Sequence, residues 1–410
     1  MRILFLDAYF EPEETAFTHL EQNIIEALVL KGHEIYVLCP TPTRGIHQSI
    51  RNKYKKMHKE DLYDGNVHVT RFYAPNEGIL PFFRAIRYFW CNFQTFVKSS
   101  NFKNIDVIFA NSSPPTQGWI AGKIAKKMKI PFVYNLQDIF PDSLVNANMT
   151  KKGSLIWRIG YNIAKQTYYN SDRIITISER FKHNVLKTGF DKNKIIVVPN
   201  WVSTEEVFPI TRENNILFDR YNLDRKKFYV SYCGNVGHSQ NFELLIKVAI
   251  EIQKRNSEIV FVIIGDGATK NYLKEQIKIN SLSNMILLPP QSYDDIAYVF
   301  SLGDVGLVIS KKGVGGSSVP SKIVSIMAAK RPVLASFDLN SELADIIRES
   351  GCGLIVDADK KELLVDMIFY MYNNREVLNS YSISGYKYIS CIIRKDNCVN
   401  KYIKILESVK

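Results

Sequence analysis

Short apolar runs that alternate with amphipathic stretches limit the fold of this chain more than any other feature of its sequence. Each run is continuous, without alternation of polar and apolar side chains, which is typical of parallel strands covered by helices on both faces. Strands and helices that follow one another in this way predict a doubly wound α/β fold. The runs of the first half are RILFLDAYF, HEIYVLCP, VIFANSS, PFVYNLQD, RIITIS and IIVVPN.

The same cycle starts again after a polar stretch without a clear period, WVSTEEVFPITREN. A chain of 410 residues is long enough for two domains with separate cores. We therefore predict two Rossmann-like domains that face each other across a cleft. The first is expected at 1–199 and the second at 215–375, joined by a linker at 200–214. The last segment, 376–410, is expected to be helical and to cross back to the first domain.

Cysteine usage and the start of the chain bear on its compartment. The six cysteines are scattered, without a C-x-x-C pair or a metal-type spacing with histidine, which indicates a reducing compartment. The apolar start MRILFLDAYF gives way to the acidic EPEE after a few residues, too soon for a signal peptide or a membrane span. We therefore expect a cytoplasmic protein.

Positive charge is concentrated in the first half of the chain. Residues 1–198 hold 27 Lys and Arg against 17 Asp and Glu, whereas residues 199–410 hold 26 against 24. A basic surface attracts nucleic acid, anionic lipid head groups or phosphorylated substrates. The densest cluster is Arg51–Lys59, which is equally well explained as a solvated loop. No nucleic-acid-binding module is recognisable, so we expect no nucleic-acid partner.

The segment Gly78–Val97 is crowded with aromatic residues around Arg84 and Arg87. It is too polar to span a bilayer, but an amphipathic helix of this kind suits a membrane interface. A core helix of the first domain with two solvent-facing arginines explains the pattern equally well, and the sequence leaves both interpretations open.

Glycine-containing turns in the second half are candidate phosphate sites. Gly234 and Gly237 follow one apolar run, and Asp266 lies in a second strand-end turn, IIGDG. The segment Gly313–Ser336 combines three glycines, two serines and Lys322 at the start of a helix, which predicts an anion site. It does not fit the Walker A pattern.

Together these segments resemble glycosyltransferase family 4, the retaining enzymes of the GT-B fold. The resemblance runs over nearly the whole length, and within the family the chain is similar to O-antigen and capsule transferases of the L-fucosamine transferase type. It is carried by KGHEIYVLCP, NLQDIFPDS, VVPNWVSTEEVF, GNVGHSQNFELLIKVA, FVIIGDG, LLPPQSYDDIAYVFSLGDVGLVIS and SVPSKIVSIMAAKRPVLAS.

The resemblance implies that the second domain holds a UDP-sugar and the first holds the acceptor. The base and ribose are expected near Asp266 and Gln291, and the diphosphate near Gly237 and residues 317–319. The transferred sugar then points toward the first-domain loop Glu11–Thr18. The residues expected to bind substrate are Gly234, Asn235, Gly237, Gln240, Asp266, Gln291, Ser317, Ser318, Val319, Ser321, Ser325, Glu11 and Thr15.

The chain departs from the family pattern at several charged positions. The two glutamates of the family's E-x7-E pattern are replaced by Ser317 and Ser325. An Arg and a Lys that usually neutralise the diphosphate are replaced by Asn235 and Gln240. We expect Lys322 to supply that charge instead.

The family's first-domain histidine falls at about Gln137, which leaves Asp138 as the nearest ionisable group. The expected catalytic residues are therefore Lys322, Gln137 and Asp138. The leaving diphosphate can itself accept the proton of the acceptor, so the reaction needs no protein nucleophile, cofactor or metal.

We therefore expect transfer of a hexose or amino sugar from a UDP-sugar to a polyprenyl-diphosphate-linked glycan at the inner leaflet, in O-antigen or capsule synthesis. An NAD-dependent oxidoreductase is disfavoured because AYFEPEETA, after the first apolar run, contains no glycine. A nucleotide-sugar epimerase of the same fold and a non-catalytic nucleotide-sugar binder remain as alternatives.

Overall fold

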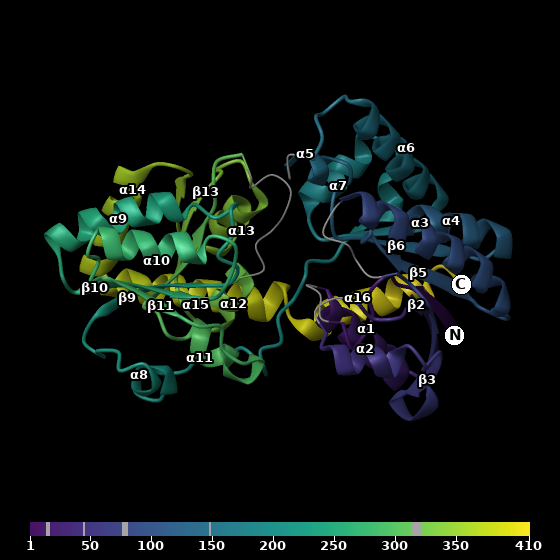
Figure 1. Ribbon diagram of the computed structural model, residues 1–410, viewed down its shortest axis with the longest axis horizontal. Helices are drawn as coiled ribbons and strands as arrows, with labels where there is room; N and C mark the ends of the chain where they lie inside the picture. Colours follow the sequence, from purple (N-terminus) through teal and green to yellow (C-terminus); the bar gives the residue numbers. More distant parts are fainter. Residues whose placement is uncertain (14–16, 44–45, 76–80, 147–148, 314–321) are drawn as a thin grey trace. The chain divides into compact units, whose positions relative to one another are not determined.

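The computed structural model describes residues 1–13, 17–43, 46–75, 81–146, 149–313 and 322–410. The chain divides into two compact units (Figure 1). Unit 1 comprises Met1–Asn200 and Asp396–Lys410, and unit 2 comprises Trp201–Lys395.

Unit 1 is built on an eight-stranded sheet in the order β3-β4-β2-β1-β5-β6-β7-β8. All neighbouring strands are parallel except the edge pair β3 and β4. The chain winds outward from β1 in one direction and from β5 in the other, so the topological switch point lies between these two strands. The strands are β1 (Arg2–Leu6), β2 (Glu34–Pro40), β3 (Lys59–Leu62), β4 (Val67–Phe72), β5 (Val107–Asn111), β6 (Phe132–Leu136), β7 (Arg173–Thr176) and β8 (Ile195–Val197).

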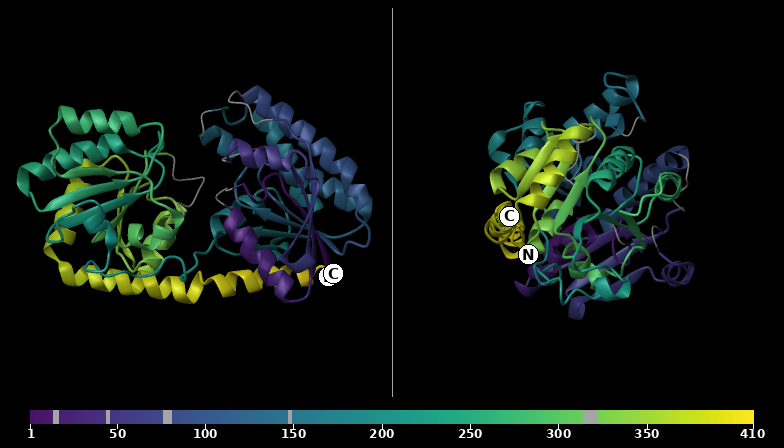
Figure 2. Two further views of the ribbon diagram at one scale, coloured as in Figure 1. Left: turned by 60° about the horizontal axis from the view of Figure 1, so that its bottom comes forward. Right: turned by 90° about the vertical axis from the view of Figure 1, so that its left-hand side faces the viewer.

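Helices cover both faces of this sheet (Figure 2). On one face, Leu4 and Leu6 join a core that includes Ile120 of α4 and Ala164 of α6. On the other face, the ring of Phe109 lies 6.3 Å from that of Tyr402 in α16. The helices are α1 (Thr18–Leu30), α2 (Gln48–Tyr54), α3 (Pro81–Lys98), α4 (Gln117–Met128), α5 (Asp142–Asn146), α6 (Leu155–Asn170), α7 (Glu179–Leu186) and α16 (Lys395–Glu407), with short 3-10 turns at Tyr63–Gly65, Ser99–Asn101 and Lys192–Lys194.

Unit 2 is built on a six-stranded parallel sheet in the order β11-β10-β9-β12-β13-β14. Here the winding direction reverses between β9 and β12, which is the switch point of this sheet. The strands are β9 (Phe228–Cys233), β10 (Ile259–Ile264), β11 (Met285–Leu288), β12 (Val305–Ile309), β13 (Val333–Phe337) and β14 (Gly353–Asp357). The helices are α8 (Ile216–Arg220), α9 (Phe242–Arg255), α10 (Lys270–Ile279), α11 (Ile296–Phe300), α12 (Lys322–Ala328), α13 (Glu342–Ser350), α14 (Lys361–Asn373) and α15 (Arg375–Ile392), with a 3-10 turn at Tyr293–Asp295.

Several helices begin where a polar side chain accepts a backbone N–H that has no partner within the helix. Ser154, Ser178 and Ser341 accept the N–H three residues further on, at the starts of α6, α7 and α13. Asn241 does the same for α9. Such caps stabilise a helix by about 1 kcal/mol each, and they define where these helices start after the strands.

The unit boundaries differ from the expected domain limits in two places. The segment expected as a linker is tied to unit 2, because Arg212 binds Asp304 and donates to the carbonyl oxygens of Arg225 and Lys227. The segment 376–410 divides, since α15 stays in unit 2 and only Asp396–Lys410 joins unit 1. In the part of the chain that the structure describes, no helix has both the length and the apolar character to cross a membrane.

Candidate functional site

The switch point of unit 2 brings a lysine next to a glycine turn. β9 is followed by Gly234, whose φ is 130°, and the neighbouring strand β12 precedes α12, which begins at Lys322. The Nζ atom of Lys322 lies 3.3 Å from the position that a Cβ at Gly234 would occupy. The same Nζ lies 3.8 Å from the ring centroid of Tyr232. The lysine therefore reaches from one side of the switch point to the other.

The environment of Lys322 favours a negatively charged ligand. The side chain is partly buried, and desolvation lowers its pKa to about 8. Within the described residues it makes a cation–π contact with Tyr232 but no ion pair with a carboxylate. A buried ammonium without a counter-charge is costly, and an anion placed against it relieves that cost. Because α12 spans seven residues, the Lys322 side chain, and not a helix dipole, supplies the positive charge.

The loops after β9 and β10 are locked together by glycine. Gly265 has φ 154°, and a Cβ there would lie 2.0 Å from the carbonyl oxygen of Gly234. A Cβ at Gly267 would lie 2.4 Å from the carbonyl oxygen of Val236. The N–H of Val236 donates to the carbonyl oxygen of Asp266 at 2.8 Å. Only glycine permits this backbone-to-backbone contact, which leaves the strand ends open to a ligand.

Asn235 and Gln240 hold the shape of the first of these loops. The carbonyl oxygen of Asn235 accepts the hydroxyl of Tyr232 at 2.7 Å. Oε1 of Gln240 accepts the N–H of Gly237 at 3.1 Å. In this structure the N–H of Gly237 is therefore used within the loop, and Gln240 shapes the turn where the family pattern has a cation.

Asp266 and Gln291 follow the adjacent strands β10 and β11, so they lie at the same edge of the sheet. The Asp266 carboxylate is exposed; the N–H of Gly267 and the ammonium of Lys270 lower its pKa. The Gln291 amide donates to the hydroxyl of Tyr221 and accepts from Arg220. Asp266 is thus an ionised acceptor, while Gln291 is already fixed by protein partners.

Some expected site residues lie outside the part of the chain that the structure describes: Thr15, Ser317, Ser318, Val319 and Ser321. Ser325 lies on α12, three residues after Lys322, and is half-buried. Glu11 in unit 1 is also half-buried, and its carboxylate accepts from the Gln22 amide at 3.0 Å.

In unit 1, Gln137 and Asp138 follow β6. The hydroxyl oxygen of Ser112 accepts both of their backbone N–H groups, at 2.9 and 3.2 Å. The Gln137 amide donates to Asn135 at 3.1 Å and accepts from Asn200 at 2.9 Å, so both of its ends have protein partners. Asp138 is exposed at this edge of the sheet. The pair thus offers one ionisable group and one fixed amide.

The sequence interpretation missed four residues near Gln137. Asp7, Glu21, Asn111 and Asn135 are all buried and are joined by hydrogen bonds. Desolvation raises the pKa of Asp7 to about 7 and that of Glu21 well above its usual range. The sequence held a signal for three of these residues, because polar residues stand at the ends of three apolar runs: Asp7 in LD, Asn111 in AN and Asn135 in YNLQ.

Among the described residues, no group of three or more His, Cys, Asp or Glu is arranged to hold a metal ion.

Comparison with known proteins identifies both halves of the chain. Residues 22–206 match the sequence family described as Glycosyltransferase Family 4, and residues 213–388 match Glycosyl transferases group 1. The chain is 23% identical to the putative colanic acid biosynthesis glycosyl transferase WcaI of Escherichia coli K12, over 98% of this chain and 99% of that protein. It is 27% identical to the probable glycosyltransferase WbjE of Pseudomonas aeruginosa, over 64% of this chain and 66% of that protein.

A third relative, 23% identical over 59% of this chain and 56% of its own length, is the Escherichia coli UDP-Gal:alpha-D-GlcNAc-diphosphoundecaprenol alpha-1,3-galactosyltransferase. Among solved structures, Anabaena Alr3699/HepE in complex with UDP matches with a TM-score of 0.74 and 15% identity over 100% of both chains. These matches confirm the expected fold class, two Rossmann-like units of the GT-B fold, and the chain belongs to glycosyltransferase family 4.

Proposed function

We propose that this protein transfers a hexose or an amino sugar from a UDP-sugar to a lipid-linked glycan, with retention of anomeric configuration. The observation that carries the proposal is the partly buried ammonium of Lys322 beside the Gly234 turn. Ligands of open α/β sheets bind outside the carboxyl ends of the strands at a switch point. The UDP complex of the Anabaena protein supports a uridine nucleotide as the ligand class.

The proposed reaction proceeds on one face of the donor sugar. The bond from the anomeric carbon to the β-phosphate oxygen breaks, and a bond to the acceptor hydroxyl oxygen forms. The hydroxyl proton passes to the departing diphosphate, so atoms and charge balance without a protein nucleophile. The role of Lys322 is to stabilise the charge that develops on the leaving group, which is greater in the transition state than in the donor.

For the acceptor we propose a polyprenyl-diphosphate-linked glycan of a bacterial surface polysaccharide, such as an O-antigen or capsule. Two relatives support this class: one is named as a putative colanic acid biosynthesis glycosyl transferase, and the other as a galactosyltransferase for a diphosphoundecaprenol-linked sugar. The similarity to the L-fucosamine transferase type remains part of the proposal.

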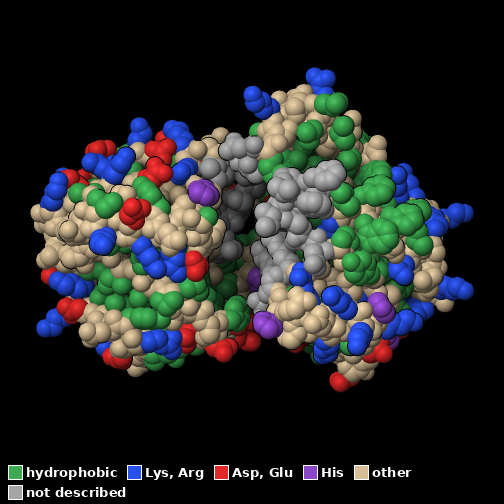
Figure 3. All heavy atoms as spheres, in the orientation of Figure 1, with side chains coloured by type: hydrophobic (Ala, Val, Ile, Leu, Met, Phe, Trp, Pro, Cys, Tyr) green, Lys and Arg blue, Asp and Glu red, His purple; other side chains and the backbone are tan. Residues whose placement is uncertain are grey.

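An exposed apolar surface on unit 1 supports a lipid-linked substrate. α3 exposes an apolar stripe that contains Phe89, Phe93 and Val97, which are 77%, 53% and 51% exposed. Figure 3 shows hydrophobic side chains gathered where Figure 1 places α3, with Lys and Arg at the margin. A helix with such a stripe and no acidic residue suits the interface of an anionic leaflet. We propose peripheral attachment to the inner face of the cytoplasmic membrane.

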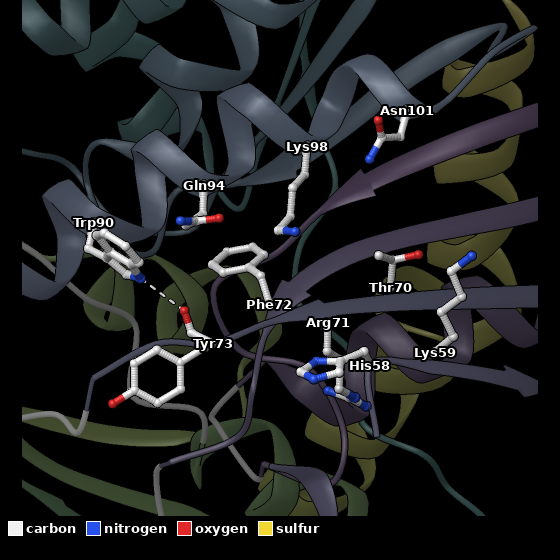
Figure 4. Close-up of a pocket in the computed structure, with 10 residues that line it drawn as sticks. All are labelled: His58, Lys59, Thr70, Arg71, Phe72, Tyr73, Trp90, Gln94, Lys98 and Asn101. Carbon is white, nitrogen blue, oxygen red and sulfur yellow. Dashed lines mark hydrogen bonds between the residues drawn. The ribbon is translucent and has the colours of Figure 1, made fainter. Parts of the chain in front are cut away.

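A groove beside this stripe favours anionic head groups. It has a volume of about 440 Å³, lies between α3 and the β3–β4 edge, and has no Asp or Glu in its lining. The side chains of Lys98 and Gln94 extend from α3 toward Phe72 (Figure 4). The Trp90 indole, at the mouth of the groove, donates to the carbonyl oxygen of Tyr73 at 2.9 Å. Within the described residues, neither Lys59 nor Lys98 has an ion pair.

A transfer assay tests the proposed function. Purified protein is incubated with each of a panel of UDP-sugars and with undecaprenyl-diphosphate-linked N-acetylglucosamine in vesicles, and the lipid is analysed by mass spectrometry. A mass gain of one sugar with one donor supports the proposal. Binding of UDP with no transfer from any donor to any lipid-linked acceptor points to the non-catalytic alternative.

Vesicle flotation tests the membrane surface. Replacing Phe89 and Phe93 by serine should reduce binding to phosphatidylglycerol vesicles at least tenfold, since each side chain contributes about 1.5–3 kcal/mol when buried. Leu363→Ser, at a 48% exposed position of unit 2, is the matched control. Equal binding of all these proteins would remove the membrane surface from the proposal.

The basic residues offer a second flotation test. Neutralising Lys53, Lys55 and Lys56 together should weaken vesicle binding at low salt, because each cation near an anionic leaflet contributes about 1 kcal/mol. Binding that is unchanged in this triple variant would mean that the cluster faces away from the membrane.

A further inference from the structure

Three neighbouring strands of unit 1 present a row of polar side chains at the carboxyl edge of the sheet. Asp7 follows β1, Asn111 ends β5 and Asn135 lies in β6. Leu6 pairs with Ala110, and Asn111 pairs with Asn135, so the three side chains are side by side on one face. All three are at least nine-tenths buried. The row lies at the switch point between β1 and β5, where an α/β sheet meets its ligand.

Two helices complete this row. α1 contributes Glu21, which is 2% exposed, and α16 contributes Tyr402, which is fully buried. The Nδ2 atom of Asn111 donates to both carboxyl groups, to Oδ1 of Asp7 at 2.9 Å and to Oε1 of Glu21 at 2.6 Å. Two buried carboxyls therefore share one hydrogen-bond donor, a costly arrangement for a purely structural core.

The carboxyls determine which way the Asn111 amide points. A carboxyl group, ionised or protonated, keeps an oxygen that accepts a hydrogen bond, and in the structure the Asn111 amide donates through its nitrogen to one oxygen of each carboxyl. Its Oδ1 atom then faces Asn135, whose Nδ2 donates to it at 2.8 Å. Reversal of Asn111 would set its nitrogen against that of Asn135, and reversal of Asn135 would set two oxygens against each other, in both cases at a buried position.

The hydrogen bonds keep the same donor-to-acceptor direction as far as the edge of the sheet. Oδ1 of Asn135 accepts from Gln137 at 3.1 Å and from the Tyr402 hydroxyl at 3.0 Å. Oε1 of Gln137 accepts from Nδ2 of Asn200 at 2.9 Å. Oδ1 of Asn200 is buried and has no hydrogen-bond partner among the described residues. These hydrogen-bonded amides, Asn111, Asn135, Gln137 and Asn200, form an amide relay. The relay starts at two carboxyls and ends in an acceptor without a donor.

We propose that Asp7 and Glu21 are positioning residues, which fix the direction of this amide relay so that Gln137 and Asn200 present a hydrogen-bond acceptor to a sugar hydroxyl of the glycan acceptor. The assignment of the ligand rests on the proposed function, whereas the direction of the relay does not. A hydroxyl donor fits the unpartnered Asn200 oxygen, while a phosphate, which only accepts, is disfavoured at this edge.

A double-mutant cycle tests the role in the reaction. Asp7→Asn and Glu21→Gln each leave one carboxyl to orient Asn111, so kcat/KM for the acceptor should fall no more than about twofold in each. The double variant leaves no carboxyl, and its kcat/KM should fall about 10- to 100-fold, as for a lost buried hydrogen bond of about 1–3 kcal/mol. UDP affinity should stay constant in all three. Losses that simply multiply would overturn the proposal.

Two further variants separate positioning from folding. Gln137→Glu keeps an acceptor for Asn200 but removes the donor to Asn135. Acceptor kcat/KM should therefore fall as in the double variant, although Asp7 and Glu21 are unchanged. Asp106→Asn is the matched control, because Asp106 accepts the N–H of Arg2 at the opposite end of β1. A loss of acceptor kcat/KM in Asp106→Asn equal to that in the double variant would show a general effect of charge and contradict the proposal.

A measurement without substrate tests the relay itself. With asparagine labelled by ¹⁵N, the side-chain amide protons of Asn111 and Asn135 should be protected from exchange with solvent in the wild type. The protection should persist in each single variant and be lost in the double variant. Rapid exchange in the wild type would overturn the relay. If the relay is protected but no sugar is transferred, the proposed function fails separately.

Discussion

The carboxyl edges of the two sheets carry opposite chemistry at equivalent topological positions. In unit 2, the switch point between β9 and β12 holds a cation, Lys322, over the bare backbone of Gly234. In unit 1, the switch point between β1 and β5 holds two carboxyls, Asp7 and Glu21, joined to a chain of amides. Both units have the same winding, yet one edge favours an anion and the other favours hydroxyl groups.

In the proposed reaction, this difference divides donor binding and acceptor binding between the two units. Topology supplies a place at which strand ends separate, and the residue types at that place decide what binds there. The lysine of unit 2 attracts a diphosphate, which supports the proposed assignment of the donor to unit 2 and of the acceptor to unit 1.

The largest effect is expected from removing the glycine contact in unit 2. In Gly265→Ala the new Cβ would lie 2.0 Å from the Gly234 carbonyl oxygen, so the backbone at the strand ends must move. We expect unit 2 to lose about 3 kcal/mol or more of unfolding free energy and its UDP affinity. Chemical denaturation and calorimetry measure the two quantities.

Gly313→Ala is the control for that substitution. Gly313 also has a positive φ, 83°, but nothing lies within 4 Å of its Cβ position. Its cost should be limited to backbone strain, about 1–2 kcal/mol. If both variants lose the same stability, the close approach of the two loops is not what requires glycine at Gly265.

The second prediction concerns the charge of Lys322. Lys322→Met keeps much of the side-chain volume but removes the ammonium, and UDP binding should weaken by about 1.5–3 kcal/mol. Lys312→Met, which removes a lysine paired with Asp357, should leave UDP affinity unchanged. Isothermal titration measures both. Equal affinities for wild type and Lys322→Met would mean that another group neutralises the diphosphate.

The third prediction uses the lowered pKa of Lys322, about 8. Below this pH the ammonium is charged and binds an anion; above it, the free protein must first take up a proton. The affinity for UDP should therefore be nearly constant from pH 6.5 to 7.5 and fall up to about tenfold per pH unit well above pH 8. This fall should be absent in Lys322→Met, and its persistence there would assign it to a different group.

The smallest expected effect concerns the carboxyl pair of unit 1. Because burial raises the pKa of Asp7 and Glu21, the folded protein holds protons that the unfolded chain has released. This contribution to stability is fully present below about pH 4 and is lost as the pH rises toward 7. Glu21→Gln should make the decline of the unfolding free energy between pH 5 and 7 shallower by roughly 1 kcal/mol, measured by denaturant titration. An identical decline would contradict the shared burial of the pair.

The sequence predicted the fold well because the strands are buried on both faces, which leaves continuous apolar runs such as RILFLDAYF. It did not predict where α15 and α16 separate, because SCIIRKDNCVN contains neither glycine nor proline to mark the break. It also suggested a linker in the polar stretch that contains Arg212. In the structure Arg212 pairs with Asp304, which lies 92 positions away in the chain.

The candidate site was predictable only in part. Glycines and a lysine after apolar runs pointed to the edge of unit 2, where the structure finds Lys322 against Gly234. The burial of Asp7 and Glu21 was not predictable, because carboxylates are almost always exposed and their spacing fits no motif. Their proximity depends on the register of β1 with β5 and on α1 packing above both.

The most direct test of the account is calorimetric titration of the purified protein with UDP, GDP and NAD, first without metal and then with Mg²⁺. The account predicts selective binding of UDP without a need for Mg²⁺, and a loss of that binding in Lys322→Met. Binding of NAD alone, or of none of the three, would contradict the assignment of the unit 2 switch point as a UDP-sugar site and, with it, the proposed transfer reaction.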